Sequence, residues 1–123
     1  IGRIDDMFTI RGENVYPSEI DAALNQLPSY GGEHRILITR DGSMDEIAVT
    51  LEADTTIWQS GPESIAAFQG VAATHLHKIL GLRAVVEIVA PNSIERTDFK
   101  ARRVIDDRDV LREMRARLEE HNS

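Results

Sequence analysis

The chain contains no cysteine among its 123 residues. This absence excludes disulfide scaffolds, thiol nucleophiles, iron–sulfur clusters and zinc sites built on cysteine. The sequence also has no apolar run close to the roughly 20 residues that a membrane-spanning helix needs, and its first residues lack the charged and apolar regions of a signal peptide. We therefore expect a soluble, cytoplasmic protein.

Basic charge and aromatic side chains are scarce as well. The chain has 14 Lys and Arg against 21 Asp and Glu, for a net charge of −7, and aromatic residues make up 5%. Nucleic-acid binding needs a basic face for the phosphates and aromatic rings for base stacking, so we expect no nucleic-acid partner. The length suits one domain. Because the chain begins at Ile1 without an initiator methionine, we expect it to be a piece of a longer protein.

The apolar pattern predicts an α+β domain. Residues 6–10 and Gly12 predict a short N-terminal hairpin. Helical and strand-like periods alternate after it, with helices over 17–27 and 60–81 and strands over 34–39, 46–52 and 84–90, the last as a central strand. This βαββαβ-like order is typical of a mainly antiparallel sheet with helices on one face, as in ferredoxin-like and ACT-like folds. An extra C-terminal helix is expected over 107–123.

Other polar residues offer little chemistry. His75 and His77 are two apart on a predicted helix and therefore face different directions, which is wrong for a shared metal. We expect both to be structural or solvated, and we expect no metal site in this chain. Trp58 lies in a polar segment, 54–60, that reads as a loop.

The most informative block is at the beginning. Gly2-Arg3-Ile4-Asp5-Asp6 is followed by Arg11-Gly12 and then by Pro17-Ser18-Glu19-Ile20. Taken alone, these residues describe a charge-paired hairpin that leads into a capped helix. The block resembles the Gly-Arg-x-Asp-Asp motif, with its following Arg-Gly and Pro-Ser-Glu-Ile, that opens the C-terminal domain of acyl-adenylate-forming enzymes. It is most similar to the phenylacetate–coenzyme A ligase family.

A second block lies near the other end. The segment 91–106, Pro-Asn-Ser-Ile-Glu-Arg-Thr-Asp-Phe-Lys-Ala-Arg-Arg-Val-Ile-Asp, is similar to the family's Pro-Gly-Ser-Ile-x-Arg-[Ser/Thr]-x-x-Lys-Ala-x-Arg-Val. Asn92, Glu95 and Phe99 depart from the common Gly, Pro and Gly, which affects the expected loop shape and leaves Lys100 in register. The resemblance covers residues 1–106 and implies no role for residues 107–123.

The resemblance implies a domain organisation. Residues 1–106 would form the mobile C-terminal lid of an adenylate-forming ligase, residues 107–123 would be a helical extension, and a larger N-terminal domain of the same chain would bind ATP and the acid. Lys100 would be the catalytic adenylation lysine. A carboxylate that attacks the α-phosphate brings two anions together, and an ammonium on a flexible stem screens their repulsion. Without the resemblance, Lys100 reads as a solvated loop lysine.

Three more roles follow from the resemblance. Arg3 would bind the nucleotide, for which a planar cation with several donors is suited. The alternative is a purely structural role for Arg3, in a salt bridge with Asp5 or Asp6. Asp5 would be the hinge about which the lid rotates between the adenylation and thioester-forming states. Gly12 would border the coenzyme A thiol in the second state, where a missing Cβ permits close approach. A plain turn glycine is the competing interpretation of Gly12.

The resemblance therefore predicts part of an AMP-forming aryl or arylacetic acid–coenzyme A ligase. The whole enzyme would convert acid, ATP and coenzyme A into acyl-CoA, AMP and pyrophosphate, and this piece alone should be inactive. Mg²⁺ is expected in the full-length enzyme but not on this domain, and a homodimer is left open. The alternative is a free-standing ACT-like regulatory module that binds a small molecule. An N-terminal nucleotide-binding domain encoded in frame upstream of Ile1 would decide for the ligase.

Overall fold

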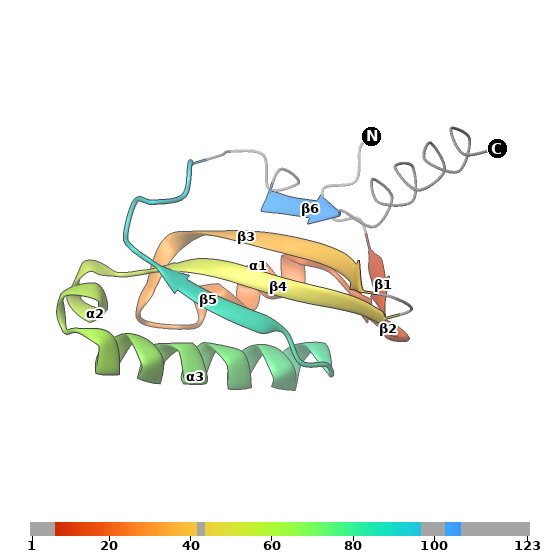
Figure 1. Cartoon of the computed structure of the whole chain (residues 1–123), viewed down its shortest axis with the longest axis horizontal. Coiled ribbons are helices and arrows are strands. Elements are labelled where there is room, and N and C mark those ends of the chain that lie inside the picture. The colour runs from red at the N-terminus through yellow and green to blue at the C-terminus, as the bar shows by residue number, and fades with distance from the viewer. Residues whose placement is uncertain (1–6, 42–43, 97–102, 107–123) are drawn as a thin grey trace.

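The computed structural model describes residues 7–41, 44–96 and 103–106 (Figure 1). It opens with a two-stranded hairpin, β1 (Phe8–Ile10) and β2 (Glu13–Val15), in which Ile10 pairs with Glu13. The two turn residues, Arg11 and Gly12, both have positive φ, 51° and 80°. Two consecutive turn residues with positive φ give the backbone a twist that matches the right-handed twist of the flanking strands. The predicted hairpin and the turn glycine are confirmed.

Two helices confirm the predicted helical periods. Helix α1 spans Pro17–Asn25 and starts with a proline at its first turn, where the missing N–H costs nothing. Helix α3 spans Pro62–Leu80 and ends at Gly81, whose left-handed φ of 77° terminates the helix. The two helices pack against each other, and Nε2 of His75 lies 2.8 Å from Oε1 of Gln26 between them.

The main sheet has four strands in the order β5-β4-β3-β6. Their bounds are β3 (Tyr30–Asp41), β4 (Met44–Ala53), β5 (Val85–Val89) and β6 (Val104–Asp106). Strands β3 and β4 are antiparallel, whereas β5 is parallel to β4 and β6 is parallel to β3. The sheet is therefore mixed, and the prediction of a mainly antiparallel sheet was wrong. Helices α2 and α3 return the chain from the end of β4 to the start of β5, which makes that outer pair parallel.

Two further sheet predictions need correction. The segment 84–90 forms an edge strand, because β4 is the one described strand that pairs with β5, and Val85 is 60% exposed. Its nearly continuous apolar run suggested burial on both faces, but only alternate residues reach the core. The strand predicted over residues 6–10 pairs within the hairpin and does not join the four-stranded sheet. The α+β class is confirmed, whereas the ferredoxin-like or ACT-like strand arrangement is not.

The segment 54–60 is a short helix and not the predicted loop. Helix α2 spans Thr55–Gln59, and the side chain of Asp54 caps it by accepting a 2.8 Å hydrogen bond from the N–H of Ile57. Trp58 lies on this helix, 38% exposed. An aspartate before Thr-Thr-Ile is an N-cap signal that could have revealed the helix. The C-terminal helix predicted over 107–123 lies outside the described residues.

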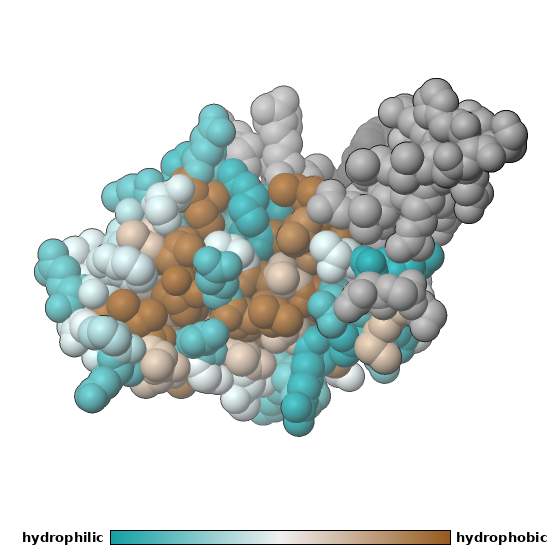
Figure 2. All heavy atoms as spheres, in the orientation of Figure 1, coloured by the Kyte–Doolittle hydropathy of each residue, from teal (hydrophilic) through white to brown (hydrophobic). Residues whose placement is uncertain are grey.

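The core lies between the helices and one face of the sheet. Figure 1 shows α1 behind the strands and α3 running beside β5. Alternate residues of β3 and β4 face the helices and are buried, namely Ile36, Ile38, Ile47, Val49 and Leu51. The other face carries a row of apolar side chains that the strand register aligns, Ile105, Leu37, Ala48 and Val85. Apolar surface is visible over the strands from this side (Figure 2).

Among the described residues, no helix combines the length and apolar character that a membrane crossing requires. No group of three metal-ligating side chains comes together in that part of the chain either.

Candidate functional site

A β-bulge at one end of the sheet gathers charged groups in the interior. Tyr30 pairs with Ala53 and His34 with Leu51, so β3 has extra residues opposite β4. Glu33 and His34 are consecutive, yet each is only 1% exposed. On a regular strand, neighbouring side chains point to opposite faces, and the bulge removes this alternation.

Gly31 is required at this bulge. A Cβ built on Gly31 would lie 2.5 Å from the carbonyl oxygen of Ala53 and 2.8 Å from Cβ of Glu52. Both distances are too short for any side chain, so the close approach of β3 and β4 depends on glycine here. The sequence showed this glycine only as part of a break between a helix and a strand.

Glu52 at the end of β4 is fully buried and binds the segment that follows β5. Nη1 of Arg96 donates to Oε2 of Glu52 at 2.8 Å, and Nη2 of Arg96 lies 2.8 Å from Oε1. The N–H of Ile94 donates to the same Oε2 at 2.9 Å. Nη2 of Arg96 also donates to Oδ1 of Asn92 at 3.0 Å. The hydrogen bond to Glu52 raises the pKa of the Arg96 guanidinium.

Glu33 binds the start of the last described segment. Nε of Arg103 donates to Oε1 of Glu33 at 2.5 Å, and Nη1 of Arg103 donates to Oδ1 of Asp21 on α1 at 3.3 Å. Arg35 adds a second cation, with Nη1 3.6 Å from Oε1 of Glu33. Nη2 of Arg35 donates to the carbonyl oxygen of Glu95 at 2.7 Å. The two carboxylates thus hold separate segments of the chain against the same end of the sheet.

A tyrosine and a histidine complete this polar cluster. The hydroxyl of Tyr30 lies 2.8 Å from Nδ1 of His34. Burial, followed by the nearby Arg103 guanidinium, lowers the pKa of His34 from 6.5 to about 4. Burial raises the pKa of Tyr30 well above its usual value of 10.0. Both side chains are therefore neutral near pH 7 and act as a hydrogen-bonded pair between charged groups.

Of the four residues that the sequence singled out, the structure describes one. Gly12 lies at the tip of the β1–β2 hairpin, and a Cβ built there would have no atom of the described residues within 4 Å. The hairpin is held to the sheet by Arg11, whose Nε donates to the carbonyl oxygen of Asp45 at 2.8 Å. Arg3, Asp5 and Lys100 lie outside the described residues.

Sequence reasoning missed Glu33 and Glu52. Their partners, Arg96 and Arg103, belong to the second sequence motif, but the partners are 44 and 70 residues apart in sequence. Contacts over such separations leave no local pattern. The one local signal was the pair of arginines on either side of Lys100.

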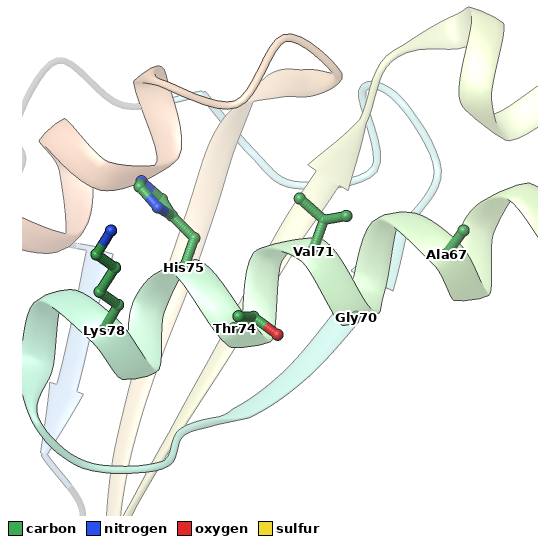
Figure 3. Close-up of a pocket in the computed structure, with 6 residues that line it drawn as sticks. All are labelled: Ala67, Gly70, Val71, Thr74, His75 and Lys78. Carbon is green, nitrogen blue, oxygen red and sulfur yellow. The ribbon is translucent and has the colours of Figure 1, made fainter.

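Two shallow hollows along α3 show less chemistry. Figure 3 shows one of them, lined by Ala67, Gly70, Val71, Thr74, His75 and Lys78 on a single side of the helix. The other lies between α2, α3 and the residues that follow α1, and has a mainly apolar lining that includes Leu27, Ile57 and Phe68. The first hollow has two basic side chains, His75 and Lys78, but no carboxylate in its lining, and no titratable side chain lines the second.

The hairpin, the mixed α+β sheet and the arginine-bound segment agree with a specific class of domain. Residues 12–108 match the family model described as the AMP-binding enzyme C-terminal domain. The chain belongs to this family, which confirms the resemblance found from the two motifs.

Named relatives are acid–coenzyme A ligases. The chain is 30% identical to a phenylacetate-coenzyme A ligase of Thermus thermophilus in an alignment 119 positions long, which covers 86% of this chain and 27% of the relative. It is also 30% identical to a phenylacetate-coenzyme A ligase of Aromatoleum evansii, over 87% of this chain and 25% of the relative. The chain therefore spans about a quarter of the length of these relatives.

Among solved structures, one ligase has a higher sequence identity to this chain than these relatives do. A crystal structure of 2-hydroxyisobutyryl-CoA ligase in complex with 2-HIB-AMP and CoA, in the thioesterification state, is 57% identical with a TM-score of 0.83. The match covers 98% of this chain and 25% of that one. The same ligase in the postadenylation state with 2-HIB-AMP is 58% identical with a TM-score of 0.78, over 97% of this chain. A domain of a phenylacetate-coenzyme A ligase from Bacteroides vulgatus has the same fold, with a TM-score of 0.75 at 22% identity.

Proposed function

We propose that this chain is the mobile C-terminal lid of an AMP-forming acid–coenzyme A ligase. The whole enzyme would convert an acid, ATP and coenzyme A into acyl-CoA, AMP and pyrophosphate. The observation that carries this proposal is the 57% identity over 98% of the chain to a ligase crystallised with its acyl-adenylate and CoA. The partner domain would be an N-terminal ATP- and acid-binding domain of the same chain, because the relatives extend far beyond the matched quarter.

Lys100 would act in the first half-reaction. Its ammonium would lie beside the acid carboxylate and the α-phosphate, where it would screen the repulsion between two anions and stabilise the charge of the transition state. Arg3 would contact the nucleotide, and Asp5 would be the hinge on which the lid turns after acyl-AMP forms. Residues 1–106 would form the lid and residues 107–123 a helical extension. Mg²⁺, where it is used, would be held by the N-terminal domain.

Gly12 would act in the second half-reaction. The open space around the hairpin tip, with no atom within 4 Å of a Cβ, fits a surface that a pantetheine chain could pass. Its positive φ also gives Gly12 a purely local reason to be glycine.

The acid would bind in the N-terminal domain, so its identity depends on residues beyond this chain. The relatives at 30% identity favour an arylacetic acid such as phenylacetate. The higher identity to 2-hydroxyisobutyryl-CoA ligase favours a short branched hydroxy acid as the second candidate. Assays of the full-length enzyme should therefore use both acids. We also propose that this enzyme is cytoplasmic.

The test is Lys100→Ala in the full-length enzyme. Acid-dependent ATP–pyrophosphate exchange, measured with phenylacetate and with 2-hydroxyisobutyrate, should fall by about two to three orders of magnitude, the scale for losing one preorganised charge partner. Thioester formation from supplied acyl-AMP and coenzyme A should persist, because the lid would by then have moved Lys100 away. The matched control is Lys78→Ala on α3, which removes the only other lysine of the chain and should leave both half-reactions unchanged.

Two results would contradict the proposal. An equal loss of both half-reactions in Lys100→Ala would refute the alternating lid. A wild-type protein that exchanges pyrophosphate with neither acid, yet binds amino acids in isothermal titration, would favour the free-standing ACT-like regulatory module.

A further inference from the structure

Two arginines of the second sequence motif bracket the segment 97–102. Arg96 precedes it and Arg103 follows it, and Lys100 lies four residues after the first and three before the second. Each arginine is bound by a carboxylate that the fold buries, Glu52 at 0% and Glu33 at 1% exposure. The lid role proposed for Lys100 gives no reason for this arrangement, because that role needs only the lysine.

Stability alone is a weak reason for two such pairs. Removing a carboxylate from water is costly, and apolar side chains of similar size often stabilise an interior at least as well as an ion pair does. The hydrogen bonds that Arg96 and Arg103 donate to Glu52 and Glu33 are directional, however, whereas an apolar contact is not. Buried pairs that join distant parts of a chain therefore suit a position that has to be exact within the domain.

The first anchor fixes the chain immediately before residue 97. Glu52 accepts from both the Arg96 side chain and the N–H of Ile94, at 2.8 and 2.9 Å. Arg35 of β3 adds a hydrogen bond to the carbonyl oxygen of Glu95 at 2.7 Å. The backbone of residues 94–95 and the side chain of Arg96 are thus all tied to β3 and β4.

The second anchor fixes the chain immediately after residue 102. Arg103 donates to Glu33 at 2.5 Å and to Asp21 at 3.3 Å, so it joins β3 and α1. The next residue, Val104, begins β6 and pairs with Ile36 of β3. The chain is therefore held to the main sheet on both sides of residues 97–102.

We propose that Glu52 and Glu33 are positioning residues for adenylation. Through Arg96 and Arg103 they fix both ends of the segment that carries Lys100 and so set where its ammonium can reach. This inference rests on the proposed function, since it assigns the anchors to the half-reaction in which Lys100 would act. In thioester formation, Glu52 and Glu33 would have no role other than keeping the domain folded.

The experiment uses the full-length enzyme with Glu52→Gln and Glu33→Gln. Glutamine keeps the size and one accepting oxygen of each side chain while it removes the charge. Three quantities are measured: ATP–pyrophosphate exchange with whichever of phenylacetate and 2-hydroxyisobutyrate the wild type uses, thioester formation from the matching acyl-AMP, and hydrogen exchange of peptides covering 97–102. The matched control is Arg40→Gln, which breaks another arginine–carboxylate contact, to Asp45 at 2.8 Å, at the end of the β3–β4 pair opposite the bulge.

We expect each glutamine variant to lower pyrophosphate exchange 10- to 100-fold, to keep thioester formation within twofold, and to speed hydrogen exchange over 97–102. Arg40→Gln should change none of the three. If Glu52→Gln does not fold, Arg96→Lys replaces it, since lysine keeps the charge but not the two-pronged geometry. It should speed hydrogen exchange and slow adenylation by a smaller factor.

Equal losses in both half-reactions would show a merely structural role and overturn the inference. Unchanged hydrogen exchange over 97–102 would also overturn it, as would faster hydrogen exchange with full adenylation. The parallel Lys100→Ala variant identifies which idea has failed. If Lys100→Ala loses adenylation and the glutamine variants do not, the proposed function stands and the positioning role falls; if Lys100→Ala keeps adenylation, both fall.

Discussion

Gly12 offers a direct test of where coenzyme A meets this domain, through the pair Gly12→Ala and Gly12→Leu. With φ at 80°, any residue with a Cβ is strained at this turn, by about 1–2 kcal/mol. No atom lies within 4 Å of the Cβ position, so a leucine side chain adds no clash within the described residues. Alanine and leucine should therefore destabilise the domain equally, with a melting temperature lower by about 4–8 °C per kcal/mol.

The two substitutions should differ in function if Gly12 borders the coenzyme A channel. Thioester formation from supplied acyl-AMP should stay near normal for Gly12→Ala and fall at least about tenfold for Gly12→Leu, which corresponds to a barrier about 1.4 kcal/mol higher. Pyrophosphate exchange should be similar for both, because the hairpin tip would face elsewhere during adenylation. Each half-reaction is measured in the full-length enzyme, below the melting temperatures of both variants.

Gly61 provides the control for backbone strain. It precedes α3, has a φ of 99°, and also has no atom within 4 Å of a Cβ. Gly61→Leu should lower the melting temperature and leave both half-reactions unchanged. If Gly12→Ala and Gly12→Leu instead lose both half-reactions in step with their stability, Gly12 is a turn residue alone and the coenzyme A site is misplaced.

Three other predictions concern the bulge, the buried histidine and the hinge. Gly31→Ala should destabilise the domain by about 1–3 kcal/mol in urea unfolding, since its Cβ would lie 2.5 Å from a carbonyl oxygen. Gly70→Ala on α3, where no described atom lies within 4 Å of the added Cβ, should stabilise the domain by about 0.5–1 kcal/mol. A Gly31→Ala variant more stable than Gly70→Ala would refute the packing argument. His34 is neutral in the folded domain, with a pKa of about 4. Its contribution to the free energy of unfolding is therefore complete above pH 6.5 and declines by about 3 kcal/mol as the pH falls to 4. The unfolding free energy of His34→Gln should lack this decline, and an unchanged pH dependence would exclude His34 as its source. Asp5→Pro fixes φ near −65° and should uncouple the two half-reactions, whereas full turnover would contradict the hinge.

Local signals in the sequence determined much of this domain. Proline at the start and glycine at the end of α3, with apolar residues at helical spacing between them, predicted that helix to within two residues at each end. The N-terminal hairpin followed from the same kind of signal, because Gly12 marks a turn that the backbone can make only with positive φ. The two motifs were likewise sufficient for the family, since each lies within a stretch of about 20 residues or fewer.

Tertiary structure decided which strands are neighbours. An apolar run such as Val85–Val89 has the same composition at a sheet edge as at its centre. It is an edge because, in the part of the chain that the structure describes, β5 pairs only with β4. The short strand Val104–Asp106 carries no pattern of its own and exists because β3 offers it a parallel partner. Strand order depends on contacts between distant segments, which local periodicity does not encode.

Tertiary structure also decided how the charges of the second motif are used. Sequence placed Arg96 and Arg103 on either side of Lys100, but their partners, Glu52 and Glu33, belong to strands far upstream. Glu33 reaches the interior only because the bulge at Gly31 interrupts the alternation of β3. A buried ion pair requires two groups to leave water together, so it arises from the folded arrangement and not from either segment alone.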